Sequence, residues 1–459
     1  MTEPLNRYYN MKMAVVDLSA RSVDVYPLSA NIVEEGIGGA CANLKLFEEF
    51  QDENPMVLGV GPLTGSFAPA SALMVATFVD TSANRFCHTP LLLRAGPELK
   101  FSGFDFVVIK GRSSDPQALL ISNESIRVTS ARDVVGMRLN EALAAFRAQR
   151  PHVYESIILN SFASDHHSPY AAICTETGGS LDKCGMAAWM SSRNLKTVVM
   201  NGTGGLPFES GHATVARRLR DRIFVQRRPD DSGCLAILTR VDPTWRKKRW
   251  LTKRIGKALA CYNCPAPCMS YIELKGTPKG RENQKAGFVL LDHMGFLALL
   301  RKRGNQAPVL TNECFQLGLD PVAASAHLAG EDHTEQDLEI LARLAETEDN
   351  DDKRMIFGKE FGKEGFPVKG LDGQVHRLFG GGIPLFVTDH GKENGRLWTR
   401  RVATAMILGI CPLIVLLYPQ LGEGALLPFL FEGKGDQESF QKTLDSCVGT
   451  ILQKSFPLS

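Results

Sequence analysis

The sequence predicts an α+β fold with a strand-rich N-terminal half and a helical C-terminal half. Up to about Gly205 the chain consists mostly of short β-branched runs bounded by Gly, Pro, Ser or Asp. Beyond that point, apolar residues recur at helical spacing. A chain of 459 residues is long enough for about two to four such domains.

The first half contains most of the predicted strands. Two helical stretches, 42–50 and 139–150, interrupt them. The strands of this half are expected to end near Gly205, with the stretch 186–205. The other predicted strands are 11–19, 23–29, 55–61, 72–80, 104–111, 118–122, 125–130, 156–160 and 170–177.

The second half is predicted to be helical at 214–225, 253–260, 285–303, 312–328 and 335–347. The stretch 402–422 carries no charge and is long enough for a membrane span. Pro412 and Pro419 interrupt it, which favours a buried core segment instead. Asp165, His166 and His167 are interpreted as a polar loop.

Composition narrows the class of protein. The net charge of +2 is too small for a general nucleic-acid binder. The N-terminus lacks the charged and apolar regions of a signal peptide, so we expect a cytoplasmic protein whose 11 cysteines stay reduced.

Three cysteines lie close together in the stretch ACYNCPAPC, at Cys261, Cys264 and Cys268. Thiolates at this spacing can point inward together and bind iron or zinc. A compact triplet needs a distant fourth ligand, and Cys411 in the apolar context LGIC is the best candidate. An iron–sulfur cluster is the leading interpretation. A structural zinc site and unliganded thiols are the alternatives.

Several stretches, taken in order along the chain, resemble the aldehyde ferredoxin oxidoreductase family of tungsten–bispterin enzymes with one [4Fe–4S] cluster. The resemblance implies a β-rich domain at 1–205 that forms the base for two pterins, and helical domains at 206–330 and 331–459. It also implies a [4Fe–4S] cluster on the four cysteines named above. The resembling stretches are 15–19, 36–40, 61–71, 96–112, 189–204, 260–268, 312–320 and 408–411.

The sequence departs from the family pattern at the positions expected to contact the pterins. Gly38-Gly39 is followed by Ala-Cys, without the expected arginine. The two Asp-x-x-Gly-Leu motifs begin instead with Phe315 and Met406, which cannot accept a hydrogen bond from a pterin. Val289 falls near the position of the family's metal-site glutamate. The remnants of the pterin motifs are Gly38, Gly39, Gly318, Asp320 and Gly409.

Three functions follow as hypotheses. The leading one is an electron-transfer or accessory subunit that keeps the cluster, has lost the tungstopterin site, and works beside an intact catalytic relative. The second is an active tungsten or molybdenum pterin enzyme that oxidises an aldehyde to an acid with ferredoxin as acceptor, with Asp292 and His293 as a candidate acid–base pair. The third is a zinc-stabilised interaction protein. The basic stretch 245–254 is a candidate docking site for an acidic, ferredoxin-like partner, or a solvated helix face.

Overall fold

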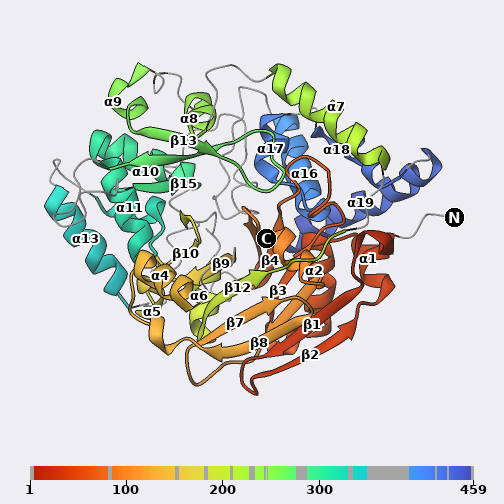
Figure 1. Cartoon of the computed structure of the whole chain (residues 1–459), viewed down its shortest axis with the longest axis horizontal. Helices are drawn as coiled ribbons and strands as arrows, with labels where there is room; N and C mark the ends of the chain where they lie inside the picture. The colour runs from red at the N-terminus through yellow and green to blue at the C-terminus, as the bar shows by residue number, and fades with distance from the viewer. Residues whose placement is uncertain are drawn as a thin grey trace.

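The fold is seen in a computed structural model (Figure 1), which places two large sheets below and the later helices above. It describes residues 5–80, 85–149, 155–179, 185–206, 210–226, 233–241, 244, 247–274, 287–328, 334–348, 392–418, 421–431 and 434–455. The prediction of a β-rich N-terminal region followed by helical regions is confirmed. The domain boundaries at 205 and 330 remain predictions.

In the described part of the chain, the first sheet has six strands in the order β2-β1-β6-β3-β4-β5. Strands β1 and β6 are parallel, and the other neighbours are antiparallel. The central strands β3 and β6 are almost completely buried, so they read as continuous apolar runs. The strands are β1 (Lys12–Asp17), β2 (Ser22–Pro27), β3 (Met56–Val60), β4 (Met74–Asp80), β5 (Arg85–Leu91) and β6 (Phe106–Lys110).

The sequence did not predict β5. This strand lies at the edge of the sheet and contains Pro90, which an edge strand tolerates because its outward side needs no donor. Its sequence contains one β-branched residue, Thr89, whereas the central strands β3 and β6 contain two and three. Antiparallel pairing with β4 along its whole length stabilises this strand, although its local sequence has only a weak strand signal.

The second sheet, again within the described residues, has the order β11-β10-β9-β12-β7-β8, with β7 and β12 parallel. Its strands are β7 (Gln117–Ser122), β8 (Ser125–Ser130), β9 (Ser156–Asn160), β10 (Ile173–Thr175), β11 (Gly178–Gly179) and β12 (Leu195–Asn201). The helices among these strands are α1 (Ala30–Gly36), α2 (Gly39–Glu49), α3 (Ala95–Phe101), α4 (Leu139–Gln149), α5 (Phe162–Asp165) and α6 (Met186–Ser192).

Two groups of helices lie above the sheets in Figure 1, with α10, α11 and α13 on the left and α16 to α19 on the right. The first group packs on one core with β9 and β10, and the second shares a core with α2 and the cysteine stretch. The helices are α7 (Ser210–Gln226), α8 (Leu235–Val241), α9 (Arg249–Thr252), α10 (His293–Arg303), α11 (Ala307–Leu317), α12 (Pro321–His327), α13 (Thr334–Glu346), α16 (Lys392–Leu408), α17 (Pro412–Leu417), α18 (Glu423–Leu426) and α19 (Lys434–Ser455).

Two of the helices predicted in the second half are wrong in part. Residues 253–260 form a strand, β13 (Ile255–Leu259), and 285–303 begins with another, β15 (Gly287–Leu290), before α10. Both pair with β14 (Met269–Glu273) in an antiparallel sheet. The short runs carry weak periodicity, so the tertiary pairing with β14 decides their conformation.

The apolar stretch after Arg401 is interrupted at Gly409, where φ is +86° and α16 ends. Residues 402–415 are buried, as a core segment requires. Among the described residues, no helix is both long enough and apolar enough to cross a membrane.

A buried histidine in the first sheet makes stability depend on pH. The His88 side chain is fully buried, its Nδ1 lies 2.9 Å from the Thr77 hydroxyl, and burial lowers its pKa to about 3. Between pH 6.5 and 3 the unfolded chain therefore binds a proton that the folded chain does not, and acid destabilises the fold. Relative to His88→Gln, we expect wild type to lose roughly 2–3 kcal/mol of unfolding free energy between pH 6.5 and 4.5.

The measurement is urea unfolding of both proteins at several pH values. Taking the difference between them removes opposing groups such as Asp105, whose burial raises its pKa to about 6. A difference in unfolding free energy between the two proteins that does not change with pH would show that His88 is not the group responsible.

Candidate metal centre

Three of the four candidate ligands lie in the loop between β13 and β14. Cys261 and Cys268 are buried, with 8% exposure each, and Cys264 is partly exposed. The Cys264 amide donates to the Cys261 carbonyl at 3.1 Å, which closes a tight turn, and Asn263 adopts φ +50° within it. The fourth candidate, Cys411, is 5% exposed and precedes α17 at the break between α16 and α17.

A Gly-, Pro- and Ser-containing segment, residues 61–73, connects the cysteine loop to Cys411, and we term it the supporting loop. The Ala70 amide donates to the Asn263 carbonyl at 2.9 Å, and the Ala70 carbonyl accepts from the Cys411 amide at 3.0 Å. The Asn263 side-chain amide donates to the carbonyls of Ser66 and Ala68 at 3.1 and 2.9 Å. These bonds therefore link the cysteine loop to the main chain at Cys411, from two distant parts of the sequence.

The supporting loop is anchored on both sides. The Leu63 amide donates to the Leu408 carbonyl at 3.0 Å, which ties the loop to the end of α16. The buried Lys100 ammonium donates to the carbonyls of Gly61 and Pro62 at 3.2 and 3.1 Å. Burial lowers the pKa of Lys100 to about 8. A lysine kept inside the protein thus fixes the start of the loop.

Electrostatics couple the four thiols. Burial raises the pKa of Cys264 to about 12 and that of Cys411 to about 11, and it holds the pKa values of Cys261 and Cys268 well above the ordinary range. Repulsion from the Cys411 thiolate adds to the rise at the other three. The four sulfur atoms therefore lie within electrostatic reach of one another. A bound cation would reverse this repulsion, because metals bind thiolates.

The donor set is the one that iron–sulfur clusters use, four cysteine thiols in a largely buried site. In the part of the chain that the structure describes, no three His, Cys, Asp or Glu side chains are already grouped closely enough to hold a metal ion. The assignment of these cysteines as cluster ligands therefore stays a prediction.

The candidate acid–base pair lies at the start of α10, where His293 contacts the cysteine loop. The Asp292 carboxylate caps α10 by accepting from the Gly295 amide at 2.9 Å. His293 Nε2 lies 2.7 Å from the Cys268 carbonyl, and burial lowers the pKa of this imidazole to about 4. Both side chains are fully buried. These contacts give the pair a structural role, and its catalytic role stays a prediction.

The glycines assigned to pterin binding all lie against protein atoms. A Cβ at Gly39, where φ is +46°, would meet the Met406 carbonyl oxygen at 1.8 Å. A Cβ at Gly409, where φ is +86°, would meet the Thr64 hydroxyl at 2.0 Å. Gly38 and Gly318 are equally crowded, by the Tyr9 hydroxyl at 2.2 Å and the Ser161 Cβ at 2.6 Å. Close packing of protein segments therefore already requires these glycines.

The other residues of the degraded motifs have protein neighbours too. The Asp320 carboxylate caps α12 by accepting from the Val322 amide at 2.8 Å. Phe315 is 2% exposed, and its ring packs edge-on against Phe288 with centroids 5.5 Å apart. Met406 is 1% exposed in the core of the later helices. The two positions where the family pattern has aspartate thus hold buried apolar side chains, which offer no acceptor to a pterin ring.

Several residues of this region were not singled out from the sequence. Asn263 acts through its side chain as well as its backbone, and the contacts of the supporting loop with the cysteine loop use backbone groups, which leave no side-chain signature. Glu176 was missed because nothing around it suggests a site. Burial raises the pKa of its carboxyl to about 7, and its charge reaches Cys261 and Glu98. The Ile157 amide donates to it at 3.1 Å.

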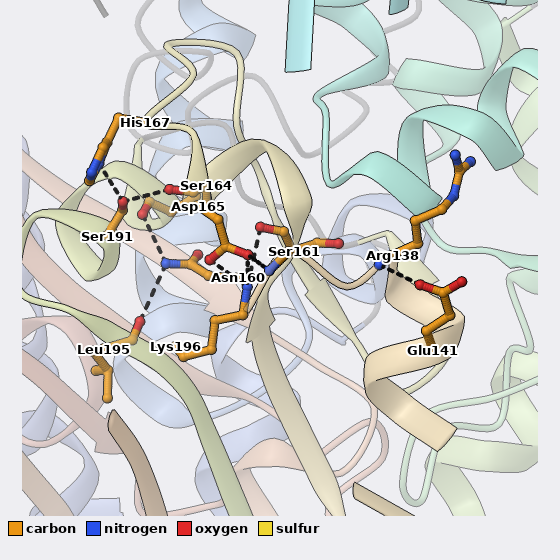
Figure 2. A network of polar contacts seen from close by, with 12 residues as sticks. Arg138, Glu141, Asn160, Ser161, Ser164, Asp165, His167, Ser191, Leu195 and Lys196 are labelled. Carbon is orange, nitrogen blue, oxygen red and sulfur yellow. Dashed lines mark hydrogen bonds and ion pairs between the residues drawn. The ribbon is translucent and has the colours of Figure 1, made fainter. Parts of the chain in front are cut away.

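The polar loop predicted at 165–167 is part of a wider network on the second sheet, which Figure 2 shows. The Asp165 carboxylate pairs with the buried Lys196 ammonium at 2.6 Å. His167 Nδ1 lies 2.9 Å from the Ser191 hydroxyl. Burial lowers the pKa of Lys196 against the opposing effect of Asp165. These contacts join α5, α6 and β12 and give the network a structural explanation.

Comparisons with known proteins match this chain to one family. The profile of the aldehyde ferredoxin oxidoreductase N-terminal domain matches residues 13–202. The WOR-like subunit of an aliphatic sulfonate oxidoreductase from Pyrococcus furiosus is 23% identical over 62% of this chain and 53% of its own length. A tungsten-containing aldehyde ferredoxin oxidoreductase from Pyrococcus abyssi is 26% identical over 34% of this chain and 26% of its own length. The matched region thus spans about half or less of these relatives.

A solved structure shares the fold over nearly the whole chain. It is the active-site complex BamBC of benzoyl coenzyme A reductase, determined with 1,5-dienoyl-CoA. The likeness has a TM-score of 0.69 and covers 98% of this chain and 89% of that one, at 15% identity. Such low identity supports the fold alone. The domain match and the named relatives together show that this chain resembles the aldehyde ferredoxin oxidoreductase family, most clearly over residues 13–202.

Proposed function

We propose that this chain is an electron-transfer or accessory subunit that binds one [4Fe–4S] cluster through Cys261, Cys264, Cys268 and Cys411 and has lost the tungstopterin site. One observation supports it most. Backbone bonds through the supporting loop connect the main chain at Cys411 to the cysteine loop, while protein atoms pack against the glycines of the pterin motifs.

The relatives agree with a subunit role. One is named as a WOR-like subunit, and the structural neighbour is described as an active-site complex. An intact catalytic relative is therefore the partner we expect for this chain.

The residues of the site suit a relay. A bound cluster would supply one-electron transfer, with a potential that depends on burial and on hydrogen bonds to its sulfur atoms. The protein's own part is to keep the four thiols together, to exclude water at Cys261, Cys268 and Cys411, and to hold the cysteine loop rigid. Asn263 and His293 hold the cysteine loop in place through hydrogen bonds to main-chain carbonyls.

Metal content distinguishes the hypotheses. After purification without oxygen, about four iron and four acid-labile sulfide per chain with no tungsten or molybdenum would support the cluster-only subunit. One tungsten or molybdenum per chain would favour a working pterin enzyme instead. One zinc without sulfide would favour the interaction protein.

The docking surface for a redox partner is best placed on α7. The basic stretch proposed from the sequence, 245–254, is exposed at Lys247, Lys248, Arg249 and Lys253, but α7 directly contacts the cysteine loop. The Arg220 guanidinium donates to the Asn263 side-chain oxygen at 2.8 Å. Arg217, Arg218 and Arg222 are exposed on the same helix. This surface can attract an acidic partner to within a short distance of the candidate cluster.

Reversal of charge on α7 tests this placement. The triple variant Arg217→Glu, Arg218→Glu, Arg222→Glu is expected to slow reduction of an acidic ferredoxin at least tenfold at low salt, because it replaces attraction by repulsion. A matched variant, Lys247→Glu, Lys248→Glu, Lys253→Glu, changes the other basic stretch. Stopped-flow rates at several salt concentrations compare the two. A larger loss in the matched variant would place the partner there instead.

A further inference from the structure

Two cysteines outside the candidate centre face each other across the first and last long helices. Cys41 lies on α2 and Cys447 on α19, and these helices pack together. The Cys447 thiol lies 3.2 Å from the Glu35 carbonyl, to which it can donate, and it is also within hydrogen-bond reach of the Cys41 sulfur. Both thiols are reduced in the structure. Residues 406 positions apart in the sequence thus form a dithiol pair.

A pocket of about 500 Å³ opens onto this pair. Both cysteines line it, together with Glu34, Glu35, Lys45, Glu48 and Lys442. The volume is in the range of small-molecule sites. The two thiols are nearly buried as residues, at 3% and 1% exposure, yet they border a space that a small reagent can enter. Geometry therefore gives the pair both a partner and a route of access.

The electrostatics of the pocket divide the two thiols into different roles. The hydrogen bond from Cys447 lowers the pKa of Cys41 against the opposing effect of burial, and the charges of Lys45 and Lys454 add to the lowering. The same hydrogen bond raises the pKa of Cys447. Lys45 pairs with Glu35 at 2.6 Å, and Lys454 pairs with Glu48, so both ammonium groups are held at the pocket. Cys41 is the more nucleophilic thiol, and Cys447 is placed to resolve it.

We propose that Cys41 and Cys447 form a reversible disulfide with small-molecule disulfides such as oxidised glutathione, and that this bond fastens α19 to α2. The Cys41 thiolate attacks one sulfur of the small disulfide, which forms a mixed disulfide and releases one thiol. The Cys447 sulfur then attacks the Cys41 sulfur and releases the second thiol. Two electrons pass from the cysteine pair to the small disulfide, and both cysteine protons end on the released thiols.

The cross-link would restrain a neighbouring part of the molecule through α2. The first residue of this helix, Gly39, packs against the Met406 carbonyl in α16, five residues before Cys411. A bond between α2 and α19 therefore restrains the segment that carries the fourth candidate ligand. The inference does not depend on the proposed cluster, because neither thiol belongs to that set.

Peptide mapping gives a direct test. Trypsin cuts after Arg21, Lys45, Lys442 and Lys454, so Cys41 is the sole cysteine in 22–45 and Cys447 the sole one in 443–454. The full-length protein is exposed to oxidised glutathione, free thiols are alkylated after unfolding, and the digest is analysed without reduction. We expect the 22–45 peptide joined to 443–454, formed at least tenfold faster than any modification of Cys87, a cysteine buried on β5.

Variants separate the steps. In Cys447→Ala, the glutathione adduct should persist on Cys41, and in Cys41→Ala the rate of modification of Cys447 should fall at least tenfold. Lys45→Gln should slow the reaction, because it removes a charge that favours the thiolate. A stable glutathione adduct on Cys41 in the wild type, free thiols at both positions, or equal reactivity of Cys87 would each overturn the proposal. The wild-type map decides the matter even if a variant fails to fold.

Discussion

Replacement of Cys411 by alanine is expected to remove most of the iron and sulfide from the purified chain, leaving less than about one iron per chain in place of about four. Cys411 is the candidate ligand contributed by the C-terminal half, and its backbone is held by the supporting loop rather than by its own side chain. Loss of its sulfur should therefore remove one ligand without unfolding the loop. The amide bond to the Ala70 carbonyl stays available in the variant.

The matched control is Cys87→Ala, which also removes a buried thiol but lies on an edge strand of the first sheet. Iron and sulfide analysis of both proteins, with the electron paramagnetic resonance signal of the reduced cluster, makes the comparison. Full iron content in Cys411→Ala would mean that another residue supplies the fourth ligand of the cluster. Loss of iron in both variants would point to general destabilisation by cavity formation instead.

The sequence predicted much of the fold because the central strands carry their own signal. The apolar runs of β3 and β6 are buried on both faces, and the helical spacing of α13 is strong, so local pattern and tertiary structure agree there. β13 was taken for a helix because its exposed, basic sequence gives no alternation. Its partner β14 lies beyond the cysteine loop, and the pairing depends on the tertiary fold.

The sequence predicted the cysteines of the candidate centre but not the groups that connect them. The spacing of Cys261, Cys264 and Cys268 made them candidates, and the apolar context pointed to Cys411. What joins them could not be read from the sequence, because the joining groups are the backbone amides and carbonyls of the supporting loop. Asn263 adopts the left-handed conformation that Asn and Gly tolerate in tight turns. The sequence is consistent with this conformation, but only the structure shows it.

The glycines show the converse problem. The resemblance assigned Gly39 and Gly409 to pterin binding, because glycine lets a ligand approach the backbone closely. The structure shows that other protein segments make that approach, with the Met406 carbonyl at one position and the Thr64 hydroxyl at the other. A glycine indicates that something lies close to the backbone, and the sequence alone does not say what. The same reasoning identifies a glycine that couples the supporting loop to Cys411.

Gly61→Ala is expected to destabilise the protein by about 3 kcal/mol or more, because an added methyl group meets backbone that cannot move aside. A Cβ at this position would lie 2.2 Å from the Leu408 carbonyl carbon and 2.3 Å from the Gly409 amide nitrogen. The methyl would push the supporting loop away from the end of α16, where the Leu63 amide donates to the Leu408 carbonyl. We expect the iron content to fall together with the stability.

Gly449→Ala provides the control. This glycine lies in α19 with no atom within 4 Å of an added Cβ, so alanine should stabilise the helix by about 0.5–1 kcal/mol and leave the iron content unchanged. Denaturant unfolding and iron analysis of both variants give the comparison. If Gly61→Ala lowers stability but keeps full iron, the supporting loop does not position Cys411. If Gly61→Ala changes neither the stability nor the iron content, the supporting loop does not pack closely against the end of α16. A joint loss of both would mean that the distant fourth cysteine reaches the other three because a glycine leaves room for one backbone to lie against another.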